Sequence, residues 1–417
     1  MFYKITPPAV IDTSVNLPAS KSISNRALII HALTGGEIWP ENLSDCDDTE
    51  VIIKALQEKP GEADLKGAGT AMRFMTAYYS TQPGEHILTG TERMKHRPIG
   101  ILVDALRALG AKISYTSAEG YPPLRITGQH IEGGFLEMPS NVSSQYISAL
   151  LMIGPVLERG LELKLSGGII SRPYIDLTLC TMRDFGADVE WTGPDTITVA
   201  PKPYTPRPYR IENDWSASSY WYELLALNAN SDSHIELEGL ADGSRQGDSM
   251  VRYLFSVLGV KTSFEKKEMG VPTNVKLRYS QCSLPRMEYD FINQPDLAQT
   301  FVVTCALKGI PFHFKGLSTL HIKETDRIAA LKTEMRKLGY VLHDREDGEL
   351  IWEGERCEPW SQPVIETYED HRMAMAFAGA SFFFPQMRIN HPEVVTKSYP
   401  RFWDDLRQAG FTIESIV

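Results

Sequence analysis

The sequence predicts an α/β protein of two domains, built from a repeated unit in which a helix is followed by a glycine and a short strand. Two observations lead to this prediction. The chain has 417 residues, and domains typically span about 100–200 residues, so two domains are expected. Segments with apolar residues three and four positions apart recur along the chain, and each ends at a glycine that a short apolar run follows.

Five segments share this pattern, and their closing glycines are Gly110, Gly186, Gly259, Gly339 and Gly410. A glycine just past a helix end can adopt the left-handed conformation that closes the helix. The glycines lie roughly 70–80 residues apart, which is typical of a repeated supersecondary unit. The segment DDTEVIIKALQ resembles a shorter first copy. The alternative is that helix–glycine–strand successions arose separately, as they do in many α/β proteins.

A segment rich in proline and tyrosine at residues 203–215 predicts a crossing between two halves.

Composition narrows the function classes. The formal net charge is −11 and no long run of Lys or Arg is present, which argues against nucleic acid as a partner. No stretch reaches the roughly 18 consecutive apolar residues of a membrane span, and the start MFYKITPPAV lacks the apolar core of a secretory signal. The five cysteines form no CxxC pair and no metal spacing with His, which indicates reduced thiols in the cytoplasm. We therefore expect a cytoplasmic protein without a metal or cofactor.

On such an acidic chain, an anionic substrate must meet local clusters of cations. The first cluster lies in LPASKSISNRALIIHAL, where residues 18–22 are expected to form a loop that opens a helix. Ser22 and Arg26 are four apart and share a face, while Lys21 precedes the first turn, where helix N–H groups attract anions. The alternative is a serine-capped surface helix with two solvated cations.

Two further segments in the first half carry glycine or cations. In KGAGTAMRF, Gly67 and Gly69 would let the backbone approach a ligand closely, and Thr70 could cap the helix that follows. In TERMKHRPIG, Arg97 and three neighbouring cations precede Pro98, which we expect to be the first residue of a helix. Cations there oppose the helix dipole by roughly 0.3–1 kcal/mol each, so an anion is expected nearby. Turn geometry and side chains splayed into water are the alternatives.

Hydroxyl and amide donors stand at two more expected helix starts and suit a phosphate: Ser143, Ser144, Gln145, Ser171 and Tyr174. Ordinary capping is the alternative for each serine.

Three motifs in the second half combine acids with cations. QPDLAQTFVVTCAL places Asp296 at the start of an apolar helix, where it could simply favour the helix dipole. HIKETDRIAAL carries Lys323, Glu324 and Arg327, and TYEDHRMAMAFA carries Asp370, His371 and Arg372. For these two motifs a surface salt-bridge cluster is the alternative. Because the polar groups lie at N-terminal ends of apolar helices, stacking of the repeats would bring them together in a positive cleft.

The chain resembles the family of 5-enolpyruvylshikimate-3-phosphate synthases in a series of short segments. In chain order these are KSISNR, AGTAMR, ERMKHRPIG, SSQ, SRPY, KETDR, DHRMAM and the late Lys397. The resemblance spans nearly the whole chain. It implies two domains of three βαβαββ units each, with helices facing inward and a cleft between the domains. It also implies that residues 1–18 and 212–417 form one domain, into which a second domain of residues 19–211 is inserted. The activity that it implies is transfer of the enolpyruvyl group of phosphoenolpyruvate to the 5-hydroxyl of shikimate-3-phosphate, without a metal or cofactor.

The resemblance further implies residue roles. The implied catalytic residues are Asp296, Glu324 and Lys21: Asp296 would be the base for the 5-hydroxyl, Glu324 would transfer a proton at the methylene carbon, and Lys21 would contact both substrates. The implied shikimate-3-phosphate contacts are Lys21, Ser22, Arg26, Ser143, Ser144, Gln145, Ser171, Tyr174, Asp296 and Lys323. The implied phosphoenolpyruvate contacts are Lys21, Gly69, Arg97, Gln145, Arg327, His371, Arg372 and Lys397. Arginine forks suit the carboxylates and phosphates of both substrates. A monomer is expected.

Three positions depart from the family pattern. Thr319 stands where Asn is common near the shikimate hydroxyls, Gly67 replaces a common Asn, and Phe74 replaces a usual Pro. Because glyphosate competes with phosphoenolpyruvate in this family, Phe74 predicts weaker inhibition by glyphosate through a shift of the helix start near Gly69.

The sequence disfavours two rival functions. The related enzymes that transfer enolpyruvate to UDP-N-acetylglucosamine generally carry Lys-Asn in place of Lys21-Ser22 and a Cys before the RPxG helix, and this chain has neither. A non-catalytic relative that binds shikimate phosphates is disfavoured by the presence of Lys21, Asp296 and Glu324.

Overall fold

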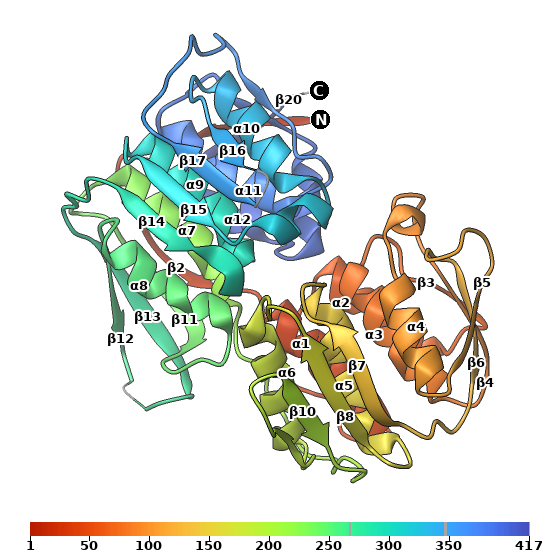
Figure 1. Ribbon diagram of the computed structural model, residues 1–417. Coiled ribbons are helices and arrows are strands. Elements are labelled where there is room, and N and C mark those ends of the chain that lie inside the picture. Colours follow the sequence, from red (N-terminus) through yellow and green to blue (C-terminus); the bar gives the residue numbers. More distant parts are fainter. Residues whose placement is uncertain (267, 346–347, 417) are drawn as a thin grey trace. The chain divides into compact units, whose positions relative to one another are not determined.

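The computed structural model describes residues 1–266, 268–345 and 348–416. The chain divides into two compact units: a terminal unit of Met1–Pro18 with Glu212–Val417, and an inserted unit of Ala19–Ile211. We describe each unit by itself (Figure 1).

The inserted unit contains two successive βαβαββ repeats. The first comprises β3 (Glu62–Asp64), α3 (Gly69–Ser80), β4 (Gly84–Thr89), α4 (Gly100–Ala108), β5 (Lys112–Tyr115) and β6 (Leu124–Gly128). Its sheet has the order β3-β4-β6-β5, with β3 parallel to β4 and the other pairs antiparallel. The second has the same topology and comprises β7 (Gly134–Pro139), α5 (Ser144–Ile153), β8 (Leu161–Ser166), α6 (Arg172–Asp184), β9 (Val189–Trp191) and β10 (Thr196–Val199).

The third expected repeat of this unit is reduced. It supplies the helices α1 (Lys21–Leu33) and α2 (Asp47–Glu58). Its described residues form only an isolated parallel bridge between Glu41 and Arg210 in place of a four-stranded sheet. This difference arises because the chain enters and leaves the inserted unit here, so the segments that would form strands are short connections.

The terminal unit contains three repeats. One is continuous: β14 (Met287–Asp290), α9 (Ala298–Leu307), β15 (Phe312–Lys315), α10 (Arg327–Lys337), β16 (His343–Arg345) and β17 (Glu349–Trp352). Another has the inserted unit between its first strand and first helix: β2 (Asp12–Asn16), α7 (Trp215–Asn228), β11 (His234–Ala241), α8 (Val251–Ser256), β12 (Val260–Phe264) and β13 (Pro272–Tyr279). Both repeat the parallel-then-antiparallel strand order.

The last repeat joins the two chain ends. It comprises β18 (Val364–Ile365), α11 (His371–Ala378), β19 (Arg388–Asn390), α12 (Phe402–Gln408), β20 (Thr412–Ile416) and the N-terminal strand β1 (Phe2–Thr6). Strand β1 pairs antiparallel with both β19 and β20, so both ends of the chain lie in one sheet (Figure 1). The N-terminal strand therefore completes a repeat whose other elements lie about 360 residues further on in the sequence.

The predicted helix–glycine closures are confirmed. The five glycines have φ angles of 109° (Gly110), 85° (Gly186), 99° (Gly259), 89° (Gly339) and 92° (Gly410). A side chain would be strained in this region, so glycine is the residue that ends each helix without a steric penalty.

The first helix of each repeat lies in the interior of its unit. Helices α7, α9 and α11 pack against one another in the terminal unit, and α1, α3 and α5 do so in the inserted unit. Every residue of α9 and α11 is buried, as expected for helices that are apolar on nearly all sides. Each unit therefore gathers three buried helices, whose N-terminal ends carry the polar residues described below. In the described ranges, no helix is both long and apolar enough to cross a membrane.

Candidate active site

Lys21 is the first residue of α1. Ser20 caps this helix, and its Oγ accepts a bond of 3.5 Å from the amide N–H of Ile23. The expected loop over residues 18–22 is therefore wrong at its end, because the serine cap starts the helix at Lys21. The Lys21 ammonium donates to the Asp48 carboxylate at 3.1 Å. This contact fixes Lys21 at the place where the helix dipole favours an anion.

Arg26 is a buried cation, only 3% exposed, and its hydrogen-bond partners among the described residues are all uncharged. It donates to Thr178 Oγ1 (2.7 Å), Ser148 Oγ (3.2 Å) and the carbonyls of Ser22 (2.8 Å) and Tyr174 (3.2 Å). Burial lowers its pKa to about 10. Buried charges are normally paired, so Arg26 is suited to receive an anionic ligand. Its contacts also confirm that Ser22 and Arg26 share one face of the helix.

Gly69 and Arg97 lie directly against each other. A Cβ placed on Gly69 would be 2.6 Å from Nη1 of Arg97.

The expected helix start at Pro98 is wrong: α4 begins at Gly100, because the amides of residues 102 and 103 bond the carbonyl of Ile99. Lys95 and His96 lie in the 3₁₀ turn Met94–His96, which Arg93 precedes and Arg97 follows, so these cations do not stand at the start of a helix. Thr70 lies in the first turn of α3 and does not cap it.

The serine-rich starts of α5 and α6 are helix N-termini, as predicted. Ser143 caps α5 and accepts from the Gln145 amide at 3.3 Å. The Gln145 side chain donates to Thr70 Oγ1 at 3.0 Å, next to Gly69. Ser171 precedes α6 with a left-handed φ of 56° and no side-chain cap bond. Tyr174 follows in the first turn of α6, where its carbonyl accepts from Arg26.

In the terminal unit, Asp296 is held by three cations. It lies in the 3₁₀ turn Pro295–Leu297 that leads into α9. Its carboxylate accepts from Arg327 (3.0 Å) and Arg372 (3.0 Å) and lies 3.5 Å from the Lys323 ammonium. Burial alone would raise the pKa of Asp296, but the charges of Arg372, Lys323 and Arg327 bring it well below its ordinary value. The carboxylate is therefore ionised, and the surrounding cations oppose its protonation.

Arg327 joins three carboxylates although it is almost fully buried, with a side chain 2% exposed. Besides Asp296, it donates to Asp370 at 2.6 Å and to Glu324 at 2.8 Å. Burial opposes its charge, but these carboxylates outweigh burial and raise its pKa. Arg327 thus binds Asp296 through Nη1 and Glu324 through Nη2.

The remaining predicted residues of this unit join the same network. The Lys397 ammonium, at the end of the 3₁₀ turn Pro392–Lys397, lies 3.8 Å from Glu324. His371 and Arg372 are the first two residues of α11, and Asp370 caps this helix by accepting from the Arg372 amide at 2.9 Å. Nδ1 of His371 lies 3.9 Å from the Asp370 carboxylate. The structure therefore connects all seven predicted site residues of this unit.

Three acids in these networks were not among the predicted site residues: Asp48, Asp370 and Asp248. Asp370 stands in the DHR motif, and its position before an apolar helix is the signal that would have assigned it. Asp248 is 3% exposed and accepts from Ser216. Burial and the nearby Asp296 charge raise its pKa to about 6. No spacing in the sequence points to Asp48 or Asp248, because their partners are distant in sequence.

The departures from the family pattern are also placed. Phe74 is fully buried in the middle of α3, and its ring centre lies 5.5 Å from the Arg26 guanidinium carbon. Thr319 Oγ1 is buried without a partner among the residues that the structure describes. Gly67 precedes the start of α3 by two residues.

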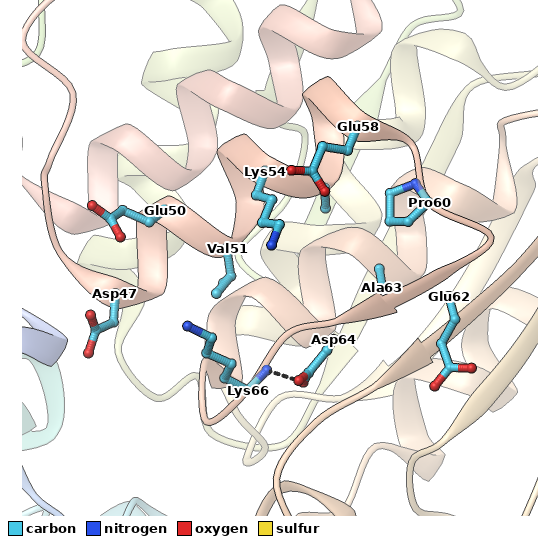
Figure 2. A pocket seen from close by; sticks show the side chains of 11 residues that line it. Asp47, Glu50, Val51, Lys54, Glu58, Pro60, Glu62, Ala63, Asp64 and Lys66 are labelled. Atoms are coloured by element: carbon cyan, nitrogen blue, oxygen red, sulfur yellow. Dashed lines mark hydrogen bonds between the residues drawn. The ribbon is translucent and has the colours of Figure 1, made fainter.

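A pocket of about 360 Å³ lies elsewhere in the inserted unit, between α2 and β3 (Figure 2). Five of its lining residues are acids and two are lysines: Asp47, Glu50, Glu58, Glu62, Asp64, Lys54 and Lys66. Its charge disfavours an anionic substrate. The described part of the chain contains no group of three or more His, Cys, Asp or Glu residues that could hold a metal ion.

Each unit thus presents cations on or next to its helices, and Lys21 and Arg372 lie at the starts of the buried helices α1 and α11. The inserted unit supplies Lys21, Arg26 and Arg97 with hydroxyl and amide donors. The terminal unit supplies Lys323, Arg327, Arg372 and Lys397 with the two carboxylates Asp296 and Glu324. Such sets can bind phosphates and carboxylates and can move protons through the carboxylates.

Comparisons with known proteins agree with this chemistry. The profile of the family described as EPSP synthase (3-phosphoshikimate 1-carboxyvinyltransferase) matches residues 5–59 and 57–406. A 3-phosphoshikimate 1-carboxyvinyltransferase of Bacteroides fragilis is 57% identical over 414 residues, covering 99% of each chain. One of Cellvibrio japonicus is 36% identical over 434 residues, covering 98% of this chain and 99% of the relative. The solved EPSP synthase of Acinetobacter baumannii has the same fold, with a TM-score of 0.76 at 21% identity over the full length of both chains. The chain belongs to the EPSP synthase family.

Proposed function

We propose that this chain transfers the enolpyruvyl group of phosphoenolpyruvate to the 5-hydroxyl of shikimate-3-phosphate and releases phosphate, as a 3-phosphoshikimate 1-carboxyvinyltransferase. Membership of the family supports this activity. The observation that carries it in the structure is the arrangement around Asp296, where one ionised carboxylate is held by three cations and shares Arg327 with Glu324.

For shikimate-3-phosphate, the proposed contacts lie mainly at helix starts of the inserted unit. Arg26 is central among them, because it is buried and its hydrogen-bond partners among the described residues are uncharged. The full proposed set is Lys21, Ser22, Arg26, Ser143, Ser144, Gln145, Ser171, Tyr174, Asp296 and Lys323.

For phosphoenolpyruvate, the proposed contacts are the arginines and their neighbours. Arginine binds a carboxylate or phosphate through two parallel N–H bonds. The full proposed set is Lys21, Gly69, Arg97, Gln145, Arg327, His371, Arg372 and Lys397.

Proton transfer is assigned to the two carboxylates. Asp296 takes the proton of the 5-hydroxyl as its oxygen attacks C2 of phosphoenolpyruvate, and Glu324 transfers a proton to C3. The tetrahedral intermediate then loses phosphate and a C3 proton, which restores the double bond. In the structure, the cations around Asp296 hold its pKa low. When the substrate's own anions engage Arg327, Arg372 and Lys323, they weaken that hold and make Asp296 a stronger base.

We extend the proposal to organisation and location. The terminal and inserted units are proposed to be the two domains of the enzyme, which acts as a cytoplasmic monomer. The five free thiols support a reducing compartment. Size-exclusion chromatography with light scattering tests the monomer.

Phosphate release is the direct test of the function. Purified protein is mixed with both substrates, with each substrate alone, and with UDP-N-acetylglucosamine in place of shikimate-3-phosphate. Release only with shikimate-3-phosphate and phosphoenolpyruvate together is expected, and glyphosate should compete with phosphoenolpyruvate. Absence of release with both substrates would overturn the proposal, and release with the nucleotide sugar would support the related transferase instead.

A further inference from the structure

The carbonyl of Pro98, the residue that follows Arg97, is held by two side chains. The Tyr146 hydroxyl donates to it at 2.7 Å and the Arg73 guanidinium at 3.0 Å. Helix α4 starts beyond this carbonyl, since the amides of its first turn bond Ile99. The turn that carries Arg97 is therefore held by hydrogen bonds from side chains of α3 and α5 and not by α4.

Tyr146 connects this turn with the other proposed contacts of phosphoenolpyruvate. It follows Gln145 in α5 and is 6% exposed. Its ring centre lies 5.9 Å from the Arg73 guanidinium carbon. Arg73 in turn donates to the carbonyl of Gly69 at 3.0 Å. One buried assembly thus links the segments of Gln145, Gly69 and Arg97, which come from three different parts of the sequence.

The Arg97 side chain lies beside this assembly. Its Nε is buried without a hydrogen-bond partner within residues 1–266, 268–345 and 348–416, and its guanidinium lies against the backbone of Gly69. Because the guanidinium is carried by the Arg97–Pro98 turn and lies against Gly69, a displacement of this turn would move the guanidinium relative to a bound anion. Misplacements of this size are costly for binding and catalysis.

We propose that Tyr146 is a positioning residue for phosphoenolpyruvate: its hydroxyl holds the Arg97–Pro98 turn so that the Arg97 guanidinium faces the substrate. The inference rests on the proposed function and deepens it, because it names a residue that acts through Arg97. Tyr146 itself touches no substrate in this assignment.

Tyr146→Phe is the decisive variant, because it removes one hydroxyl and keeps the ring. The Pro98 carbonyl retains its bond from Arg73, so no buried acceptor loses all its partners. Tyr204→Phe is the matched control: Tyr204 lies in the same unit, is also 6% exposed and donates to a backbone carbonyl, that of Met152, at 2.8 Å. Thermal unfolding of both variants verifies that they fold.

Steady-state kinetics then separate positioning from packing. For Tyr146→Phe we expect the KM for phosphoenolpyruvate to rise about three- to tenfold, the loss that one hydrogen bond produces. The KM for shikimate-3-phosphate should stay within about twofold of wild type, as should all constants of Tyr204→Phe. An unchanged KM for phosphoenolpyruvate, or an equal rise in the control, would overturn the inference.

A double variant tests whether Tyr146 acts through Arg97. If Tyr146 acts through Arg97, the two substitutions should not be additive. In the Arg97→Lys background, the fold-rise in the phosphoenolpyruvate KM caused by Tyr146→Phe should be less than about half of the fold-rise that Tyr146→Phe causes in wild type. Full multiplicative effects would show that Tyr146 acts independently, against the inference. If wild type released no phosphate at all, the proposed function would fail; an active wild type with an unaffected Tyr146→Phe would refute only the inference.

Discussion

Gly69 and Arg97 are so close that a Cβ on Gly69 would lie 2.6 Å from Nη1 and 2.9 Å from Cζ of Arg97. The atoms that would clash form the end of a flexible side chain, so Gly69→Ala should fold while the Arg97 guanidinium moves. We expect Gly69→Ala to raise the KM for phosphoenolpyruvate about tenfold or more, the effect of losing a charge-assisted bond. The KM for shikimate-3-phosphate should change little.

Gly61→Ala is the control for this substitution. Gly61 lies in the same unit, and a Cβ there would have no atom within 4 Å. The KM for phosphoenolpyruvate is measured for Gly69→Ala, Gly61→Ala and wild type. Denaturant unfolding verifies that both variants keep their stability. Equal phosphoenolpyruvate KM values for Gly69→Ala and wild type would mean that Arg97 does not bind this substrate.

Asp296→Asn should abolish most turnover while shikimate-3-phosphate still binds. The amide keeps the shape of the side chain but cannot accept the hydroxyl proton, and general-base catalysis contributes about 10²–10⁴-fold. We expect kcat to fall in this range and the calorimetric affinity for shikimate-3-phosphate to change by less than about tenfold. If turnover stayed within a few-fold of wild type, Asp296 would be only a partner of the surrounding cations.

The same substitution makes a prediction about pH and stability. The folded-state pKa of Asp296 is well below its ordinary value, so its ionised form stabilises the fold above the unfolded pKa of about 3.9. This contribution is lost as the pH falls through the folded pKa. Asp296→Asn should therefore be less stable than wild type at pH 7, and the difference in unfolding free energy should shrink below about pH 4. A constant difference from pH 7 to pH 3 would contradict the assignment of the low pKa.

Glu223 predicts the opposite behaviour. It is fully buried in α7, and burial raises its pKa well above the ordinary value. Its Oε2 has no partner in the described part of the chain, and Thr304 approaches Oε1 at only 3.5 Å. As the pH rises above about 4.3, the unfolded state ionises before the folded state, and stability falls by about 1.36 kcal/mol per pH unit up to the folded pKa.

Glu223→Met removes this cost and should stabilise the protein by about 1–4 kcal/mol at pH 7, with little gain near pH 4. Thr304 keeps its bond to the Thr300 carbonyl at 2.7 Å, so the substitution strands no hydroxyl. Glu334→Met is the control, because Glu334 is equally buried but is paired with Lys337 and accepts from Tyr368. Chemical denaturation at several pH values should show the control destabilised; a destabilised Glu223→Met would refute the prediction.

The sequence predicted the repeat best where local chemistry decides the structure. The five glycines that end helices were identified because only glycine adopts φ near 90° without strain. The helix starts at Ser144 and His371 followed from capping residues before apolar runs. The start of α4 was placed two residues early, because Pro98 is a favoured first helical residue. The tertiary bonds from Tyr146 and Arg73 to its carbonyl cannot be read from local sequence.

The site was predicted residue by residue through family resemblance, whereas its pairing came only from the structure. Lys323, Glu324 and Arg327 stand together in one motif, but their partner Asp296 lies about 30 residues earlier. Asp248 approaches the same site from a different repeat. Contacts between repeats depend on how the buried helices stack, and a single sequence does not encode them in a local pattern.

Arg26 and Arg327 form a natural comparison, because both are buried arginines with opposite surroundings. Arg327 contacts the carboxylates of Asp296, Glu324 and Asp370. Within the described part of the chain, Arg26 donates to hydroxyls and carbonyls only. Burial lowers the pKa of Arg26 to about 10, whereas the three carboxylates outweigh burial at Arg327 and raise its pKa.

Arg26→Met should consequently leave the unfolding free energy unchanged or raise it by about 1–3 kcal/mol, while shikimate-3-phosphate affinity falls at least about tenfold. Thr178 and Ser148 remain bonded to each other at 2.8 Å, so their hydroxyls are not stranded. Arg327→Met should instead lower the unfolding free energy by about 3–5 kcal/mol, because three carboxylates lose a shared cation. Denaturation and calorimetry with shikimate-3-phosphate measure both quantities. If Arg26→Met proved as unstable as Arg327→Met, the bonds of Arg26 would be structural, and the absence of a carboxylate beside it would no longer indicate a place for the substrate.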